Sequence, residues 1–230
     1  MFADALLGVA VRRFEPDVSP RSVEIALTFR DGNPWLEDAV LTKRFYFRRA
    51  GPHWRGLVSE PVPVRWRPGR DLTNGLTDMA VALFAARKAA GLLGGGGWSG
   101  AALAALPEYK ALAAKLAGSD AGQFSFFTLF GFVGERGWVS AEESARFERE
   151  FREARERRLP QGEDVDEAAR ERDDLHAEVE ICPHGDDVAT YIAEDLFPNA
   201  IKYFGELLWA LGMTAALLTD ASSGRAGAGR

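Results

Sequence analysis

The chain has 230 residues, of which 47% are hydrophobic, and it carries a net charge of −6 and a single cysteine. This length allows one fair-sized domain or two small ones with a sizeable core. A single cysteine excludes a disulfide framework and suits a reducing compartment such as the cytosol or nucleus. The apolar stretch 200–218 contains Lys202 and Glu206, so we expect a docked helix there and not a membrane span.

The negative charge is concentrated in one segment. Residues 135–195 contain 9 Arg and 20 Asp or Glu, a net charge of −11, whereas residues 1–134 have a net charge of +4. An acidic field of this kind attracts basic partners. A solvated acidic helix and loop without a partner is the alternative that charge alone leaves open.

The first third of the chain predicts strands. Residues 1–21 read as an irregular or short helical entry, and alternation of apolar and polar residues predicts strands at 22–29, 40–47 and 60–67. Turn residues and no helix lie between these segments, which favours an antiparallel meander. Pro61 and Pro63 place the third strand at an edge. We expect one apolar face and one basic face, the latter carrying Lys43, Arg44, Arg65, Arg67 and Arg70.

Helices dominate the remainder. Helix signals predict segments at 74–90, at 101–116 and from Ser140 to about residue 158, where Ser140 caps the helix. Aromatic residues crowd positions 124–130 and are expected to be mostly buried. The acidic stretch 161–178 is predicted to be a mobile loop or a short exposed helix, and 178–181 a short strand.

A bent helix closes the pattern. From Val188 apolar residues recur every four positions, the spacing of one helix face. Asp186 and Asp187 occupy the first turn, where the helix dipole favours negative charge. Pro198 cannot donate to the preceding turn, so we expect the helix to bend or restart there.

No motif for catalysis or metal binding stands out. The four glycines at 94–97 lack a following Gly-Lys-Ser/Thr, which favours a linker over a phosphate loop. Cys182, His184 and His176 give too few closely spaced ligands for a metal site. A Ser-His-Asp triad is not excluded by sequence order, but no Gly-x-Ser-x-Gly elbow is present. We therefore expect no enzyme activity, no cofactor and no metal.

The basic strand face has two interpretations. Arginines and lysines interleaved with Tyr46, Trp54 and Trp66 could contact phosphates and stack on bases. A solvated sheet face, whose charges discourage edge pairing, is the alternative. The acidic overall charge favours this second interpretation.

Four ordered motifs resemble the nucleosome-assembly-protein (NAP)/SET family of histone chaperones. They are IALTFRDGNPWLEDAVLTKRF at 25–45, VRWRPGRDLT at 64–73, SFFTLF at 125–130, and the closing pattern that starts with Asp186-Asp187-Val188 and continues through Pro198-Asn199-Ala200 to Tyr203-Phe204. Together they span about 180 residues in the family's order, which makes the match much more specific than any one motif.

The resemblance implies an α+β "earmuff" fold in which an antiparallel β-meander packs on helices. It implies one domain over 1–218, with strands in 22–67, helices and a Gly-rich loop in 73–117, and the aromatic segment, an acidic insertion and the closing helices in 124–204. We expect the tail 219–230 to be disordered. The family's long N-terminal dimerisation helix has no counterpart in residues 1–21, so a homodimer through the apolar helix Leu207–Leu218 is one expectation.

The resemblance also implies a function. It predicts a non-enzymatic chaperone that binds core histones, of either pair, through an acidic face for nucleosome assembly or histone transfer, in the nucleus with shuttling to the cytoplasm. The carboxylates that match the family are Asp186, Asp187, Glu194 and Asp195; those assigned only by charge are Asp173, Asp174, Glu178 and Glu180. Two alternatives are a scaffold that recruits a chromatin-modifying or other protein without histone binding, and a nucleic-acid-binding protein that uses the basic sheet face.

Overall fold

The computed structural model describes residues 2–15, 19–51, 54–94, 99–118, 125–157 and 167–210. The chain divides into two compact units, Met1–Ala189 and Thr190–Arg230, and each is described by itself. The predicted linker at 94–97, except for its first glycine, and the predicted tail 219–230 lie outside the described residues. The single domain predicted over 1–218 stays a prediction.

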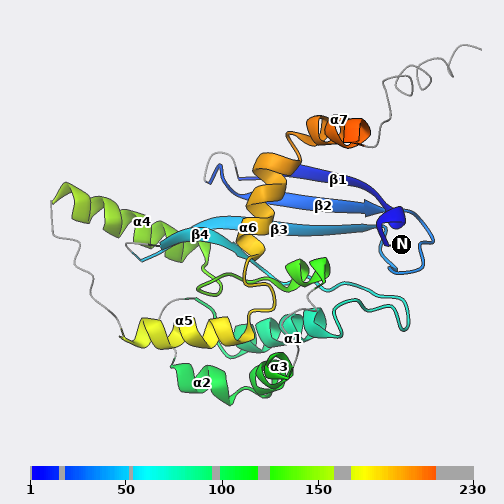
Figure 1. Ribbon diagram of the computed structural model, residues 1–230. Helices are drawn as coiled ribbons and strands as arrows, with labels where there is room; N and C mark the ends of the chain where they lie inside the picture. Colours follow the sequence, from blue (N-terminus) through cyan, green and yellow to red (C-terminus); the bar gives the residue numbers. More distant parts are fainter. Residues whose placement is uncertain are drawn as a thin grey trace, which may run out of the picture. The chain divides into compact units, whose positions relative to one another are not determined.

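The first unit contains an antiparallel sheet, so the predicted α+β class is confirmed. Within the described residues its strands are β1 (Leu6–Arg13), β2 (Val23–Phe29), β3 (Val40–Ala50) and β4 (Trp54–Ser59), in the spatial order β1-β2-β3-β4 (Figure 1). A short 3-10 helix, η1 (Phe2–Ala5), precedes β1. Each strand pairs with the next along the chain, which is the predicted meander.

The two central strands follow the predicted alternation. Val23 pairs with Phe45 and Leu27 with Leu41, and all four side chains are buried. In a strand, alternate residues share one face, so this register sets one apolar face of the sheet against the core.

Two strand predictions are wrong. The entry segment is not irregular, because Val9 and Val11 alternate and pair with Leu27 and Ile25 to form β1. The segment 60–67 is not a strand, since its prolines have no backbone N–H to donate to a neighbour. It forms only an isolated bridge between Trp66 and Leu36, and the fourth strand lies earlier, at 54–59.

Helices follow the sheet. They are α1 (Leu76–Ala89), α2 (Gly100–Ala105), α3 (Pro107–Ala117), the 3-10 helix η2 (Phe126–Gly131), α4 (Ala141–Glu156), α5 (Glu167–Val179) and α6 (Gly185–Tyr191). Figure 1 shows α1, α2, α3 and α5 grouped on the same side of the sheet. The helix predicted at 101–116 is split into α2 and α3 at Pro107, which begins the second of them. The predicted cap of α4 is confirmed as a capping box between Ser140 and Glu143.

Near its end the first unit differs from the prediction. The described part of the acidic stretch is helical from Glu167, and α5 continues to Val179, so the strand predicted at 178–181 is wrong. After α5 the chain crosses to α6 through residues 180–184 without a ladder partner.

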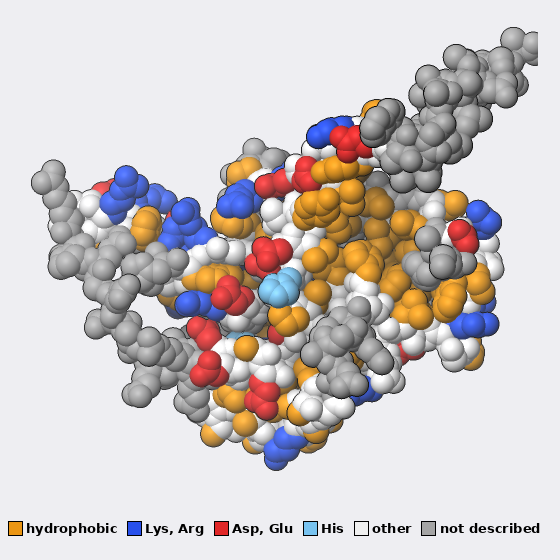
Figure 2. Space-filling model, viewed as in Figure 1, with side chains coloured by type: hydrophobic (Ala, Val, Ile, Leu, Met, Phe, Trp, Pro, Cys, Tyr) orange, Lys and Arg blue, Asp and Glu red, His pale blue; other side chains and the backbone are white. Residues whose placement is uncertain are grey.

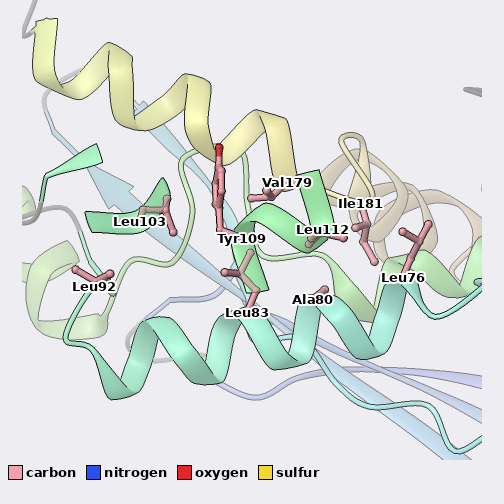
Figure 3. Packing of buried hydrophobic residues seen from close by; sticks show 9 residues of the cluster. All are labelled: Leu76, Ala80, Leu83, Leu92, Leu103, Tyr109, Leu112, Val179 and Ile181. Carbon is pink, nitrogen blue, oxygen red and sulfur yellow. The ribbon is translucent and has the colours of Figure 1, made fainter. Parts of the chain in front are cut away.

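A helical core joins α1, α2, α3 and the end of α5. Figure 3 shows side chains from these elements pointing toward one another around Leu112 and Ile181. The members are Leu76, Ala80, Leu83, Leu92, Leu103, Tyr109, Leu112, Val179 and Ile181. Gly131 of η2 lies so close that a Cβ there would be 2.3 Å from the Ile181 Cδ1. The link from α5 to α6 is therefore anchored in the same core.

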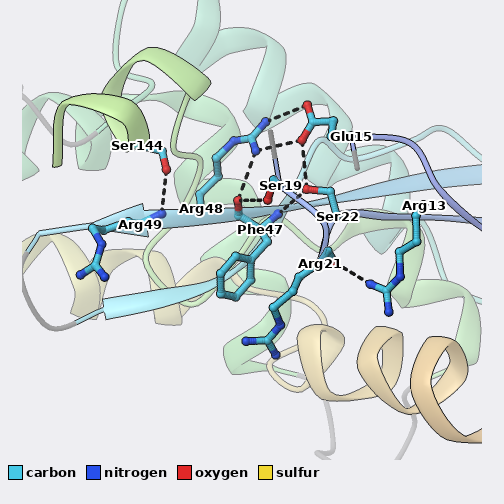
Figure 4. A network of polar contacts seen from close by, with 9 residues as sticks. All are labelled: Arg13, Glu15, Ser19, Arg21, Ser22, Phe47, Arg48, Arg49 and Ser144. Carbon is cyan, nitrogen blue, oxygen red and sulfur yellow. Dashed lines mark hydrogen bonds and ion pairs between the residues drawn. The ribbon is translucent and has the colours of Figure 1, made fainter. Parts of the chain in front are cut away.

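A polar network ties the β1–β2 connection to β3 (Figure 4). The Arg48 Nη1 donates to a Glu15 carboxylate oxygen at 3.1 Å, and the Ser22 hydroxyl donates to the same oxygen at 3.0 Å. The Ser22 hydroxyl in turn accepts from the Phe47 N–H at 3.0 Å. These bonds replace ladder pairing where the chain turns back into β2.

The second unit is a broken helix. A π-helical turn, η3 (Ile192–Leu196), is followed by α7 (Ala200–Ala210), with Pro198 between them as predicted. The Asp195 carboxylate accepts from the Asn199 amide at 2.9 Å and from the Tyr203 hydroxyl at 2.7 Å. These bonds close the gap that the proline leaves in the helix. In the part of the chain that the structure describes, no helix is long and apolar enough to cross a membrane.

Candidate functional site

Three of the four motifs meet in one aromatic cluster of the first unit. The ring of Phe127 from SFFTLF lies 4.9 Å from Trp66 of the second motif and 6.4 Å from Phe29 of the first. Edge-to-face and tilted pairs at these distances are favourable beyond the area that they bury. Packing against one another is therefore a sufficient structural role for these three aromatic motif residues.

Lys43 of the first motif is buried, so the prediction that it lies on the basic outer face is wrong. Its side chain shares the strand face of Leu41 and Phe45 and is 1% exposed. The ammonium donates to the backbone carbonyls of Glu60, Phe130 and Phe132 at 2.9–3.0 Å. An ammonium has three donors, and all three are used to hold η2 and the following loop on the sheet.

Local caps account for two further motif positions. The Asn33 amide oxygen accepts from the N–H groups of Trp35 and Leu36, which fixes the turn between β2 and β3. The Asp71 carboxylate accepts from the Thr73 N–H and hydroxyl at 2.7 Å and organises the approach to α1. Both roles are structural.

A tight turn in the first unit presents the first residues of an acidic surface. The Gly137 N–H donates to the Gly134 carbonyl at 2.9 Å, which leaves Glu135 and Arg136 at the tip. Gly137 has a φ of +70°, and a Cβ there would lie 2.5 Å from the His176 ring. Only glycine fits this conformation and this approach without strain.

Two helices bring further carboxylates to this turn. Asp173 and Asp174 come from α5, and Asp186 and Asp187 from the first turn of α6. Gly185 allows α6 to start against Phe132, because a Cβ at Gly185 would be 2.4 Å from that ring. We call the five carboxylates Glu135, Asp173, Asp174, Asp186 and Asp187 the acidic cluster.

The charges of the acidic cluster influence one another. Burial raises the pKa of Asp186, and the neighbouring charges of Asp187 and Glu135 raise it further. Burial likewise raises the pKa of Asp173, where Arg136 opposes the effect and Glu135 adds to it. The charge of Glu135 therefore acts on a carboxylate of α5 and on one of α6. Figure 2 shows acidic side chains gathered over α5 and the start of α6, beside a histidine.

Trp54 borders the acidic cluster. Its indole N–H donates to the Glu135 carboxylate at 3.0 Å. The ring also covers Gly56, where a Cβ would approach it to 2.6 Å. An indole held at both its N–H and its ring is a fixed aromatic neighbour for the carboxylates.

The other predicted carboxylates lie elsewhere. Glu178 accepts a hydrogen bond from the Tyr109 hydroxyl. Glu180 points inward and accepts from the N–H groups of Val133, Gly134 and Cys182, so we leave it out of the acidic cluster. Glu194 and Asp195 belong to the second unit, where Asp195 is engaged by Asn199 and Tyr203.

Sequence reasoning missed Glu135 and Trp54. Glu135 lies some 40 residues before the α5 carboxylates, in a segment assigned no element. The signal that could have found it is the pair of glycines at 134 and 137, which flank two charged residues in the manner of a tight turn. Nothing in the sequence indicates the bond from Trp54.

The histidines and the cysteine do not assemble into a catalytic or metal centre within the described residues. His184 lies 3.7 Å from Asp187 at the surface. His176 is buried against the Arg87 guanidinium, and burial followed by that charge lowers the pKa of His176 to about 3. Burial raises the pKa of Cys182 to about 11, which suppresses thiolate chemistry. Among described residues, no three His, Cys, Asp or Glu side chains are grouped to hold a metal.

Several arginines of the predicted basic face are already paired. The Arg44 Nε donates to Glu24 at 2.7 Å, and Arg65 forms an ion pair with Asp38. The Arg67 Nε donates to the Asn33 carbonyl at 2.8 Å. Paired guanidinium groups offer less free positive charge for phosphates. The geometry therefore favours the solvated-face interpretation.

Comparison with known proteins finds similar solved structures. The crystal structure of Ccp1 is 20% identical over 88% of this chain and 61% of that chain, with a TM-score of 0.42. A Ccp1 mutant is 19% identical over 92% and 65%, with a TM-score of 0.45. The Vps75 histone chaperone is 17% identical over 88% and 64%, with a TM-score of 0.42.

The chain spans less than two thirds of the length of each of these structures. No protein-family model and no curated protein matches the sequence. The chain resembles the NAP/SET family of histone chaperones in its motifs, and the solved structures that it resembles include a histone chaperone.

Proposed function

We propose that this chain is a histone chaperone domain that binds basic core histones through the acidic cluster, without cofactor or catalysis. The observation that carries the proposal is that carboxylates of three separate segments act on one another, since the charge of Glu135 in the turn at 134–137 raises the pKa of Asp173 on α5 and of Asp186 on α6. The ordered motifs of the family support the same assignment independently of the charge.

Mutual neutralisation supplies the mechanism. Free histones carry high positive charge and bind DNA without order, and a fixed acidic surface competes with that binding. Each exposed ion pair contributes only about 0.2–1 kcal/mol and is screened by salt. Several such pairs hold a histone firmly enough to prevent aggregation and release it to a stronger polyanion such as DNA. Either core histone pair fits this chemistry, and the work would take place in the nucleus with shuttling to the cytoplasm.

A homodimer through the C-terminal apolar helix Leu207–Leu218 is part of the proposal; residues 211–218 lie outside the described residues, and α7 contains the first part of this segment. Ile201 is 88% exposed and Phe204 is 54% exposed, three residues apart on one helix face. Exposed apolar side chains at this spacing support association with a second copy. Sedimentation of the full chain and of Ile201→Glu tests this. Wild type should sediment as a dimer and the variant as a monomer. A wild-type monomer at micromolar concentrations would remove this part of the proposal.

A titration with refolded core histones tests the central part. Neutralising Glu135, Asp174, Asp186 and Asp187 to their amides should weaken binding at least about thirtyfold, from about 0.5 kcal/mol per lost pair. A matched control neutralises Glu142, Glu150, Glu153 and Glu156 on α4, which changes the net charge equally. The control should bind within a few-fold of wild type.

Three outcomes separate the alternatives. A loss confined to the cluster variant supports the proposal. Equal losses in both variants would show that net charge and not the cluster decides binding. No histone binding by wild type at moderate salt, with a stable complex to another protein in pull-downs, would favour the scaffold alternative.

A further inference from the structure

Arg136, at the tip of the turn, forms an ion pair within the acidic cluster. The Arg136 Nε is 3.6 Å from an Asp173 carboxylate oxygen, and the two side chains are 41% and 34% exposed. Burial raises the pKa of Asp173, the charges of Arg136 and then Arg172 lower it, and the charge of Glu135 raises it again. The chain therefore supplies its own guanidinium to a carboxylate that other negative charges surround.

The backbone beneath Arg136 is fixed. The turn bond between Gly137 and Gly134 is 2.9 Å long, and the Gly137 Cα faces the buried ring of His176. The guanidinium, in contrast, ends a flexible side chain with two-fifths of its surface exposed. Arg136 can thus leave Asp173 without any change in the turn.

We propose that Arg136 is a built-in competitor for the acidic cluster. Its guanidinium fills, at Asp173, the position that an arginine side chain of a basic partner takes on binding. Binding then exchanges an internal arginine for an external one, and Arg136 sets the affinity of the cluster. This inference rests on the proposed function, because it requires that the cluster receives a basic partner.

The chemistry of the pair specifies the partner further. An exposed ion pair is weak, so the exchange costs little. A guanidinium matches a carboxylate with two parallel N–H groups, which an ammonium cannot do. Arg136 approaches Asp173 only to 3.6 Å, so a partner arginine that makes the paired contact has the advantage, and lysine in its place should bind less well.

The test compares two single charge removals in the full chain. Histone binding is measured at low ionic strength for wild type, for Arg136→Gln, and for Arg146→Gln as the control. Arg146 is an exposed α4 residue with an i,i+4 acidic neighbour, Glu150, at 3.8 Å. Arg136→Gln should tighten binding by up to about fivefold, the upper end of the range for one exposed ion pair, and Arg146→Gln less than about twofold.

A second background isolates the pair itself. In Asp173→Asn the guanidinium has lost its carboxylate, so adding Arg136→Gln should gain no more than the control does. An arginine-rich peptide and a lysine-rich peptide of equal length serve as simple probes. The gain from Arg136→Gln should be larger for the arginine peptide.

The outcomes distinguish the two proposals. If wild type binds and Arg136→Gln gains no more than Arg146→Gln, the competitor role is refuted while the histone-binding function stands. If no variant binds histones or peptides, the proposed function fails and the inference fails with it. A gain specific to Arg136 that disappears in Asp173→Asn supports both.

Discussion

Replacing Lys43 by methionine is the sharpest test of how the motifs hold the fold. Methionine preserves most of the volume but removes the ammonium that donates to three carbonyls, on Glu60, Phe130 and Phe132. It also removes the positive charge that attracts the Glu180 carboxylate. Burial lowers the pKa of Lys43 and raises the pKa of Glu180, and each charge partly offsets the shift of the other.

The expected loss follows from those contacts. The ammonium makes three charge-assisted hydrogen bonds, and a buried carbonyl left without its donor costs about 1–3 kcal/mol, so the loss should be about 3 kcal/mol or more. Urea denaturation of wild type and Lys43→Met measures the loss in unfolding free energy. The double variant Lys43→Met/Glu180→Gln should recover part of it, since Glu180 then no longer carries the carboxylate whose burial the Lys43 charge partly offset. A loss below about 1 kcal/mol, or no recovery in the double variant, would contradict a stabilising role of the Lys43 ammonium.

Three further predictions concern stability. Gly137→Ala should lose about 2–3 kcal/mol in urea denaturation, because its φ of +70° and the His176 ring both oppose a Cβ; a wild-type midpoint would contradict this. Burial lowers the pKa of His176 from 6.5 to about 3, so below pH 6.5 the unfolded chain binds a proton that the folded chain does not. Stability should therefore fall by about 2 kcal/mol between about pH 7 and about pH 5 relative to His176→Gln, and parallel pH profiles would count against it. Asp71→Ala should lose about 1 kcal/mol with the bonds to Thr73, whereas Asp78→Ala serves as an exposed α1 control.

The sequence predicted those helices and strands whose start, end or buried face is set by residues a few positions apart. β2 and β3 follow from strict alternation, and α4 follows from the capping box at Ser140. Pro198 marked the break before α7, because a proline cannot donate to the turn before it. In each case the deciding interaction lies within a few residues.

Two strand predictions failed because prolines were decisive in one segment and misleading in the other. Residues 60–67 alternate as a strand does, but Pro61 and Pro63 cannot donate to a ladder. The Val62 N–H donates instead to the Phe130 carbonyl of η2. The sequence did not predict β1, because the nearby prolines suggested an irregular entry. The residues that pair with β1 also lie ten or more positions away in sequence.

Some residues of the candidate site were predicted from the sequence and others appear only in the structure. Asp173, Asp174, Asp186 and Asp187 were found from local charge and from the family motif. Glu135 could not be assigned, because only the fold brings its charge within range of Asp173 on α5 and Asp186 on α6. Burial is equally non-local: nothing in the sequence around Glu180 shows that its carboxylate turns inward.

Site-specific photo-crosslinking to core histones shows whether the acidic cluster contacts them. A photoreactive residue at Asp174, on the exposed side of the acidic cluster, is compared with one at Glu142 on α4, both in the full chain. We expect abundant histone crosslinks from position 174 that high salt removes, and few from position 142. Equal crosslinking at both positions, or crosslinks from position 142 alone, would contradict histone binding by the acidic cluster.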